Sequence, residues 1–155
     1  LSTKIDLIKS QGKNPIFIFE PFMGCGGQLP LPEKFLNKGH KLIQQGCGIS
    51  IADEVQTGFG RLGSHYWAFE FFDIEPDIVT LGKSMGNGFP LSAVVTTKEI
   101  ANTFDNGMEY FNSFGGNPVS SVVGNTVLKI IAEEGLQENA KDVGQYLKRQ
   151  LLELK

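Results

Sequence analysis

Five polar side chains that could take part in chemistry lie at or just after the ends of predicted buried strands. They are Glu20, Asp53, Glu54, Gln56 and Lys83. A lysine amine becomes a nucleophile once it loses its proton, which burial and neighbouring positive charge promote. Open α/β sheets bind their ligands at the carboxyl ends of the strands. The sequence therefore predicts one site at this edge of a sheet, with carboxylate, amide and amine groups together.

Apolar runs alternate with helical patterns along the chain. We expect buried strands at 15–20, 48–52, 77–81 and 91–96, and helices at 1–10, 32–45, 118–133 and 137–154. Pro32 suits the first turn of its helix, and Gly46 suits the C-terminal cap. The strand at 15–20 is continuously apolar, as is typical of a strand buried on both faces. This alternation predicts an α/β fold with a mainly parallel sheet and flanking helices.

Two phosphate-binding motifs match only in part. Residues 58–63 read GxGxxG and Asp77 follows at the spacing of a dinucleotide fingerprint, but an aromatic run stands where the helix should open. Residues 82–84 (GKS) resemble the end of a P-loop, yet Asp77 occupies the position that needs the first glycine. Each of these two interpretations accounts for only part of the motif residues. A single site that uses Asp53 and Lys83 together accounts for more of them.

Three further motifs occur in order along most of the chain. They are residues 51–61 (IADEVQTGFGR), residues 76–90, which contain PDIVTLGK and GNGFP, and residues 114–118 (FGGNP). Together they strongly resemble the class III aminotransferases, which depend on pyridoxal 5'-phosphate (PLP). The resemblance implies PLP fold type I. Residues 1–155 are then part of the PLP-binding large domain, without its N-terminal part and without the C-terminal small domain.

The resemblance also assigns roles to residues. It implies that Lys83 forms the Schiff base with PLP, and that Asp53 keeps the pyridine nitrogen protonated so that the ring withdraws electrons. Val55 is expected to pack on the ring, and Gln56 to hydrogen-bond near the phenolic oxygen. Ser113 is expected to reach the phosphate of the neighbouring subunit's cofactor, which implies a homodimer. Without the resemblance, Val55 reads as a core valine and Ser113 as a turn serine.

These roles predict an enzyme that moves an amino group between an amine or amino acid and a 2-oxo acid. Within the family, residues 25–28 (CGGQ) and 110–120 look more like the subgroup of phospholyases that act on ethanolamine phosphate and phosphohydroxylysine. Many aminotransferases of the class carry glutamate where Cys25 stands. Elimination of phosphate from a phosphorylated amine is therefore an alternative, and a non-catalytic fragment is a second.

Composition restricts the partners. The net charge of -3 and the lack of a dense basic run argue against nucleic acid and an anionic membrane surface, and no apolar stretch approaches a membrane span. The two cysteines are too few for a disulfide framework, from which we expect a cytoplasmic protein. His40 and His65 have no partners that indicate a metal site or a triad, so we expect both to be structural.

Overall fold

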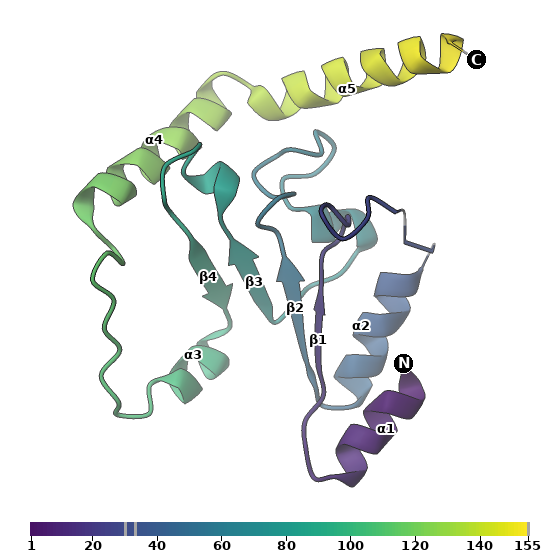
Figure 1. The fold of residues 1–155 in the computed structure, drawn as a ribbon, viewed down its shortest axis with the longest axis vertical. Helices are drawn as coiled ribbons and strands as arrows, with labels where there is room; N and C mark the ends of the chain where they lie inside the picture. Colours follow the sequence, from purple (N-terminus) through teal and green to yellow (C-terminus); the bar gives the residue numbers. More distant parts are fainter. Residues whose placement is uncertain (30, 33, 155) are drawn as a thin grey trace.

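A four-stranded sheet forms the centre of the molecule (Figure 1). The computed structural model describes residues 1–29, 31–32 and 34–154. The strands β1 (Ile16–Phe19), β2 (Ile49–Asp53), β3 (Ile78–Leu81) and β4 (Ala93–Thr96) lie in that order across the sheet. β1, β2 and β3 are parallel, and β4 is antiparallel to β3. The predicted α/β class with a mainly parallel sheet is confirmed.

Two helices pack beside the sheet at its β1 edge. α1 (Ser2–Ser10) and α2 (Phe35–Gln45) lie next to β1 in Figure 1, and α2 packs against β1 and β2. The buried core joins Phe19 of β1 and Ala52 of β2 to Leu36 of α2 and to Ile74. The 3-10 helix η1 (Ala68–Phe72) contributes Phe69 and Phe72 to the same core.

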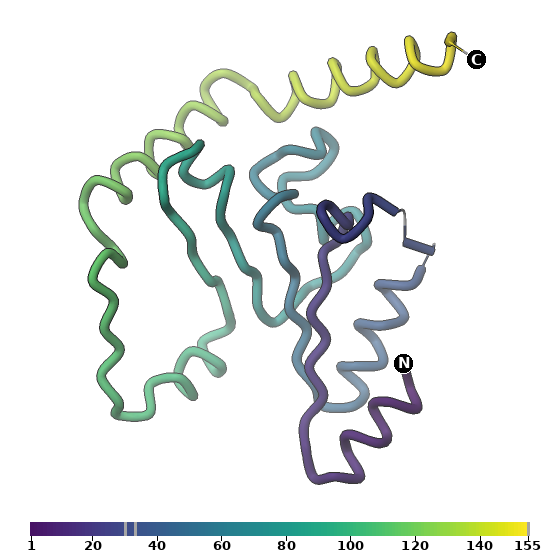
Figure 2. The backbone as a smooth tube through the Cα atoms, in the orientation of Figure 1, coloured from purple at the N-terminus to yellow at the C-terminus, as the bar shows by residue number. Residues whose placement is uncertain are grey.

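The remaining helices follow β4. α3 (Lys98–Phe104) is short, and an extended segment leads from it to α4 (Pro118–Glu133), as the tube in Figure 2 shows. α5 (Leu136–Glu153) continues from α4 and has no buried residue. A second short 3-10 helix, η2 (Lys83–Met85), follows β3 directly and contacts α4. The end of the sheet where β3 finishes therefore faces the α4 and α5 region.

The predicted elements all occur, with two differences. α2 begins at Phe35 rather than at Pro32, which instead accepts a hydrogen bond from the Phe35 N–H in a turn before the helix. β1 is covered on one face only, since Ile16 and Ile18 are each 62% exposed. Within the described residues, helices thus cover one side of this strand, so the expectation that both its faces are buried is not met.

Candidate active site

The loops that follow β1, β2 and β3 meet around one small cavity of about 100 Å³. Parallel strands place their carboxyl ends at one edge of the sheet, so segments distant in sequence converge there. The side chains that line the cavity are Glu20, Cys25, Asp53, Val55, Gln56, Thr57 and Lys83. Four of the five site residues expected from the sequence thus share one cavity, which opens to solvent through the exposed Cys25, Gln56 and Lys83.

Lys83 lies at the first position of η2, immediately after β3. Its Nζ donates a hydrogen bond of 2.9 Å to Oε1 of Gln56, which comes from the loop after β2. The backbone of Lys83 has φ +36°, a left-handed conformation that is uncommon for residues other than glycine. Such strain concentrates at functional sites, because the surrounding contacts must hold it in place. The amine is therefore presented by a constrained turn rather than by a freely moving loop.

Asp53 and Glu54 follow each other in sequence but face opposite sides of the sheet. Side chains alternate along a strand, and Ser50, Ala52 and Glu54 are each 0% exposed. Glu54 accepts hydrogen bonds of 2.8 Å from the Thr57 hydroxyl and 2.8 Å from the Phe69 N–H. Asp53 lies on the other side, in the Lys83 cavity. The buried contacts favour a structural role for Glu54 and leave Asp53 available to a ligand.

The Asp53 carboxylate is fixed by its own loop. Its Oδ1 accepts a hydrogen bond of 3.0 Å from the Val55 N–H, two residues further along. The other oxygen has no hydrogen bond within the described residues, so Asp53 can still accept one from a ligand.

The loop after β1 approaches closely because it carries a glycine. The N–H of Gly24 donates a 2.9 Å hydrogen bond to Oε2 of Glu20, which closes the loop against the end of β1. A Cβ at position 24 would lie 2.8 Å from Nε2 of Gln56, so a larger residue would displace that amide. Gly24 therefore allows Cys25 to reach the same cavity as Lys83, a packing constraint that its sequence motif did not reveal.

The groups in this cavity fit PLP. An amine, a carboxylate with a vacant acceptor position and an aliphatic side chain face one small opening, as an aldehyde, a ring nitrogen and a ring face require. A phosphate needs N–H and O–H donors as well. Thr57 lines the cavity too and was not singled out from the sequence; its hydroxyl is already engaged by Glu54.

Ser113 does not line the Lys83 cavity. It is exposed and belongs to the segment between α3 and α4, which runs along the left edge of Figure 1. Asn117 ends that segment and caps α4, because its side-chain oxygen accepts a 2.9 Å hydrogen bond from the Ser120 N–H. Pro118 follows in the first turn of α4, where its missing N–H leaves no helical hydrogen bond unmade.

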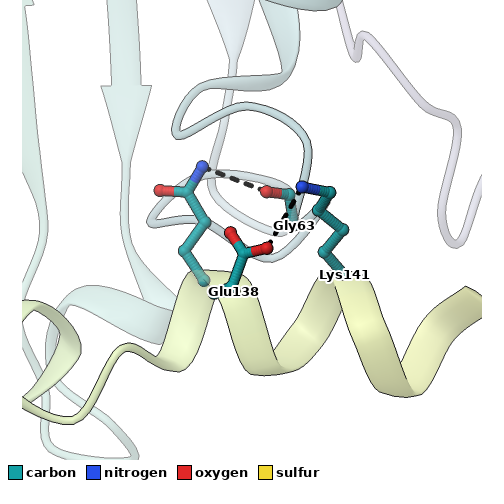
Figure 3. Close-up of polar contacts among 4 residues, drawn as sticks. Gly63, Glu138 and Lys141 are labelled. Carbon is teal, nitrogen blue, oxygen red and sulfur yellow. Dashed lines mark hydrogen bonds and ion pairs between the residues drawn. The ribbon is translucent and has the colours of Figure 1, made fainter.

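The glycines of the GxGxxG motif bring α5 against the loop after β2. Gly60 and Gly63 have φ of +77° and +74°, and a Cβ on Gly63 would lie 2.5 Å from Cα of Lys141. The side-chain amide of Gln137 donates a 3.1 Å hydrogen bond to the Gly63 carbonyl, beside the ion pair of Lys141 with Glu138 (Figure 3). These glycines thus serve helix packing and not a dinucleotide cradle.

The other candidate ligand groups have structural partners. Oδ2 of Asp77 accepts hydrogen bonds of 2.8 Å from the Ser50 N–H and 2.7 Å from the Ser50 hydroxyl, linking β3 to β2. His40 is 7% exposed within α2, and burial lowers its pKa. The described residues contain no group of three or more potential metal ligands among His, Cys, Asp and Glu. No helix in this part of the chain has the length and apolar character needed to cross a membrane.

Comparison with known proteins places this geometry in one family. The family model described as "Aminotransferase class-III" matches residues 4–155. Human mitochondrial alanine–glyoxylate aminotransferase 2 is 50% identical over 131 residues, which cover 84% of this chain and 26% of that protein. The ethanolamine-phosphate phospho-lyase homolog 1 of Caenorhabditis elegans is 43% identical over 140 residues, which cover 89% of this chain and 30% of that protein.

A solved structure is similar over almost the whole chain. A phospholyase from Arthrobacter, in complex with phosphoethanolamine, superposes with a TM-score of 0.88 and 37% identity, covering 99% of this chain and 37% of that one. The likeness confirms the predicted fold type. The chain thus spans 26–37% of the length of these relatives.

The expected cytoplasmic location is wrong. The relatives from human, Pongo abelii and Arabidopsis thaliana are mitochondrial proteins. Cysteine content separates oxidising from reducing compartments, and Cys25 and Cys47 are both free. Cysteine content does not distinguish one reducing compartment from another, so it could not support the prediction of a cytoplasmic location.

The family match and the shared cavity of Lys83 and Asp53 agree. The chain belongs to the class-III aminotransferases, a family of enzymes whose cofactor is PLP.

Proposed function

We propose that the protein is a PLP-dependent aminotransferase that moves an amino group between an amine or amino acid and a 2-oxo acid. The observation that carries the proposal is the shared cavity of Lys83 and Asp53, with Gln56 bonded to the lysine amine. When bound, PLP supplies an aldehyde that condenses with amines with loss of water, and a ring that withdraws electrons from the substrate carbon. The residues of this chain must hold that group and move protons beside it.

Lys83 has the central role in this proposal. Its Nζ would hold the cofactor through the aldehyde carbon, and as a free amine it would move a proton to and from the substrate carbon as a general acid and base. The bond from Nζ to Gln56 keeps the amine aimed into the cavity, on the side of the loop after β2. The constrained backbone at Lys83 limits where the released amine can go.

Asp53, Val55 and Gln56 hold the ring in this proposal. Asp53 would accept a hydrogen bond from the protonated ring nitrogen, since the Val55 N–H occupies only one of its oxygens. Val55 and Gln56 both line the cavity. Val55 would pack on the ring, and Gln56, which bonds to the Lys83 amine here, would hydrogen-bond near the phenolic oxygen. Ser113 would bind the cofactor phosphate of a second subunit in a homodimer. Two observations support this role: Ser113 is exposed, and it does not line the Lys83 cavity of its own chain.

Replacement of the lysine tests the proposal directly. The full-length Lys83→Ala protein, mixed with PLP, should lack the visible absorption band of lysine-bound cofactor and should lose transaminase activity. Lys129→Ala, which removes an exposed lysine from α4, is the matched control and should keep both. An unchanged visible band in Lys83→Ala would refute the assignment of the lysine.

A second function has specific support. Cys25 lines the Lys83 cavity, where many aminotransferases of the class carry glutamate, and the superposed Arthrobacter structure is a phospholyase with phosphoethanolamine. The alternative reaction uses the same amine and aspartate but expels phosphate from a phosphorylated amine. Incubation of the full-length protein with ethanolamine phosphate separates the two, because phosphate release without an oxo-acid acceptor requires the phospholyase. Absence of such release, with amino transfer to a 2-oxo acid, excludes it.

The isolated residues 1–155 are expected to be non-catalytic. Lys83 and Gln56 are exposed here, and Ser113, the donor assigned to the phosphate above, does not line their cavity within one copy of the chain. Equilibrium dialysis of the 155-residue chain with PLP should show only weak binding. Tight binding at one PLP per chain would contradict this expectation and leave the assignments of Lys83 and Asp53 intact.

A further inference from the structure

Arg61 is presented to the site by a rigid loop. The preceding Phe59 is 7% exposed and packs edge-on against Trp67, with ring centroids 5.1 Å apart. The Gly60 N–H donates a 2.9 Å hydrogen bond to the Tyr66 carbonyl, and α5 packs on the glycines at each side of Arg61. A side chain on such a loop has a fixed origin, so its reach is set by the fold and not by loop motion.

The guanidinium of Arg61 bonds to the residue next to Lys83. Its Nε donates a 2.7 Å hydrogen bond to Oγ of Ser84, the second residue of η2. Lys83 itself has the left-handed φ of +36°, which costs conformational energy unless neighbouring contacts compensate. Two side-chain hydrogen bonds hold this turn in the described part of the chain, namely Gln56 on the lysine amine and Arg61 on Ser84.

We propose that Arg61 is a positioning residue that holds the Lys83 turn in its reactive conformation through Ser84. The inference rests on the proposed role of Lys83. Gln56 fixes the end of the lysine side chain, whereas Arg61 fixes the backbone from which that side chain departs. Because the bond is exposed, its removal should leave overall stability almost unchanged. Loss of this hydrogen bond should instead relax the strained turn and slow the reaction of the lysine amine with the cofactor aldehyde.

The rate of cofactor capture by the full-length apoprotein tests this role. After PLP is added, the visible band of lysine-bound cofactor should develop roughly fivefold more slowly in Arg61→Ala, the effect of losing one hydrogen bond. Ser84→Ala should match it, and the double variant should be no slower than either single one, because both remove the same bond. Ser84→Thr keeps a hydroxyl and should restore the rate, while Arg149→Ala, an exposed arginine of α5, should behave as the unaltered protein.

The outcomes separate this inference from the proposed function. If Arg61→Ala captures PLP at the normal rate, or only raises KM for an anionic substrate, Arg61 is not a positioning residue. Additive losses in the double variant would also overturn the route through Ser84. If Arg61→Ala does not fold, Ser84→Ala measures the same bond alone. A visible band that persists in Lys83→Ala would instead refute the role of the lysine, on which this inference depends.

Discussion

The opposite orientations of Asp53 and Glu54 predict that their substitution has opposite consequences. Glu54→Ala removes the acceptor of the Phe69 N–H and of the Thr57 hydroxyl from a fully buried position. A buried donor left without a partner costs about 1–3 kcal/mol, and the vacated side-chain volume adds a cavity term. The half-buried Thr57 hydroxyl can turn to water, so we expect a total loss of about 3 kcal/mol in the free energy of unfolding.

Glu54→Gln should cost much less. Its amide oxygen can still accept from the Phe69 N–H, and its amino group can donate to the Thr57 oxygen, which also acts as an acceptor. We expect a loss of about 1 kcal/mol. Asp53→Asn should change stability by less than about 0.5 kcal/mol, because its one hydrogen bond is local and half-buried. It should nevertheless abolish most activity, since a neutral amide does not keep the ring nitrogen protonated.

Thermal unfolding and activity of the full-length variants, measured side by side, check this division. A loss of about 3 kcal/mol lowers the melting temperature, by less per kcal/mol in the longer full-length protein than the roughly 2–4 °C of a unit of 150–250 residues. Glu54→Ala should show that shift, and the fraction that remains folded should retain the visible band of bound cofactor. The reasoning is refuted if Asp53→Asn is the less stable variant, or if Glu54→Gln loses activity while Asp53→Asn keeps it.

Three further substitutions test contacts away from the Lys83 cavity. Gly63→Val should lower the unfolding free energy by about 2–3 kcal/mol, and with it the melting temperature, because its Cβ would lie 2.5 Å from the α5 backbone. Gly144→Ala is the control and should not lower the melting temperature, because nothing lies within 4 Å of a Cβ there. Asn117→Ala should cost about 1 kcal/mol in urea unfolding through loss of the α4 cap. Burial lowers the pKa of His40 below 6.5, so on acidification the unfolded chain binds a proton at this histidine before the folded protein does. The urea midpoint should therefore fall as the pH drops below 6.5. His40→Gln should remove this contribution to the pH dependence of the midpoint.

The meeting of Lys83 and Asp53 could be predicted because it depends only on strand order. Asp53 ends β2 and Lys83 comes just after β3, and these parallel neighbours end at the same edge of the sheet. Alternation along β2 likewise separates Asp53 from Glu54 without further information. The motif added the identity of Gln56, whose contact with the lysine amine involves residues 27 positions apart.

Other features depend on tertiary contacts that periodicity does not encode. The exposure of Ile16 and Ile18 reflects what covers the second face of β1, and an apolar run reads the same whether or not a cover is present. The aromatic run at 65–72 contains the 3-10 helix η1, whose Phe69 N–H bonds to Glu54 from the preceding loop. The sequence did not predict α3 because it is short, although the Thr97 hydroxyl caps it by accepting a 3.3 Å hydrogen bond from the Ile100 N–H.

If Lys83 and Asp53 have the roles proposed above, the architecture also gives a reason why one family can include both aminotransferases and phospholyases. Lys83 and Asp53 are fixed by the ends of β3 and β2, by Gln56 and by the Val55 N–H. Cys25 faces the same cavity from a loop whose own bonds are local, from the N–H groups at 24, 27 and 28 to Glu20 or to the Gly24 carbonyl. A substitution at Cys25 therefore alters what the cavity offers a substrate without disturbing the lysine or the aspartate. Selection for a new substrate can act on this loop while the cofactor chemistry stays constant.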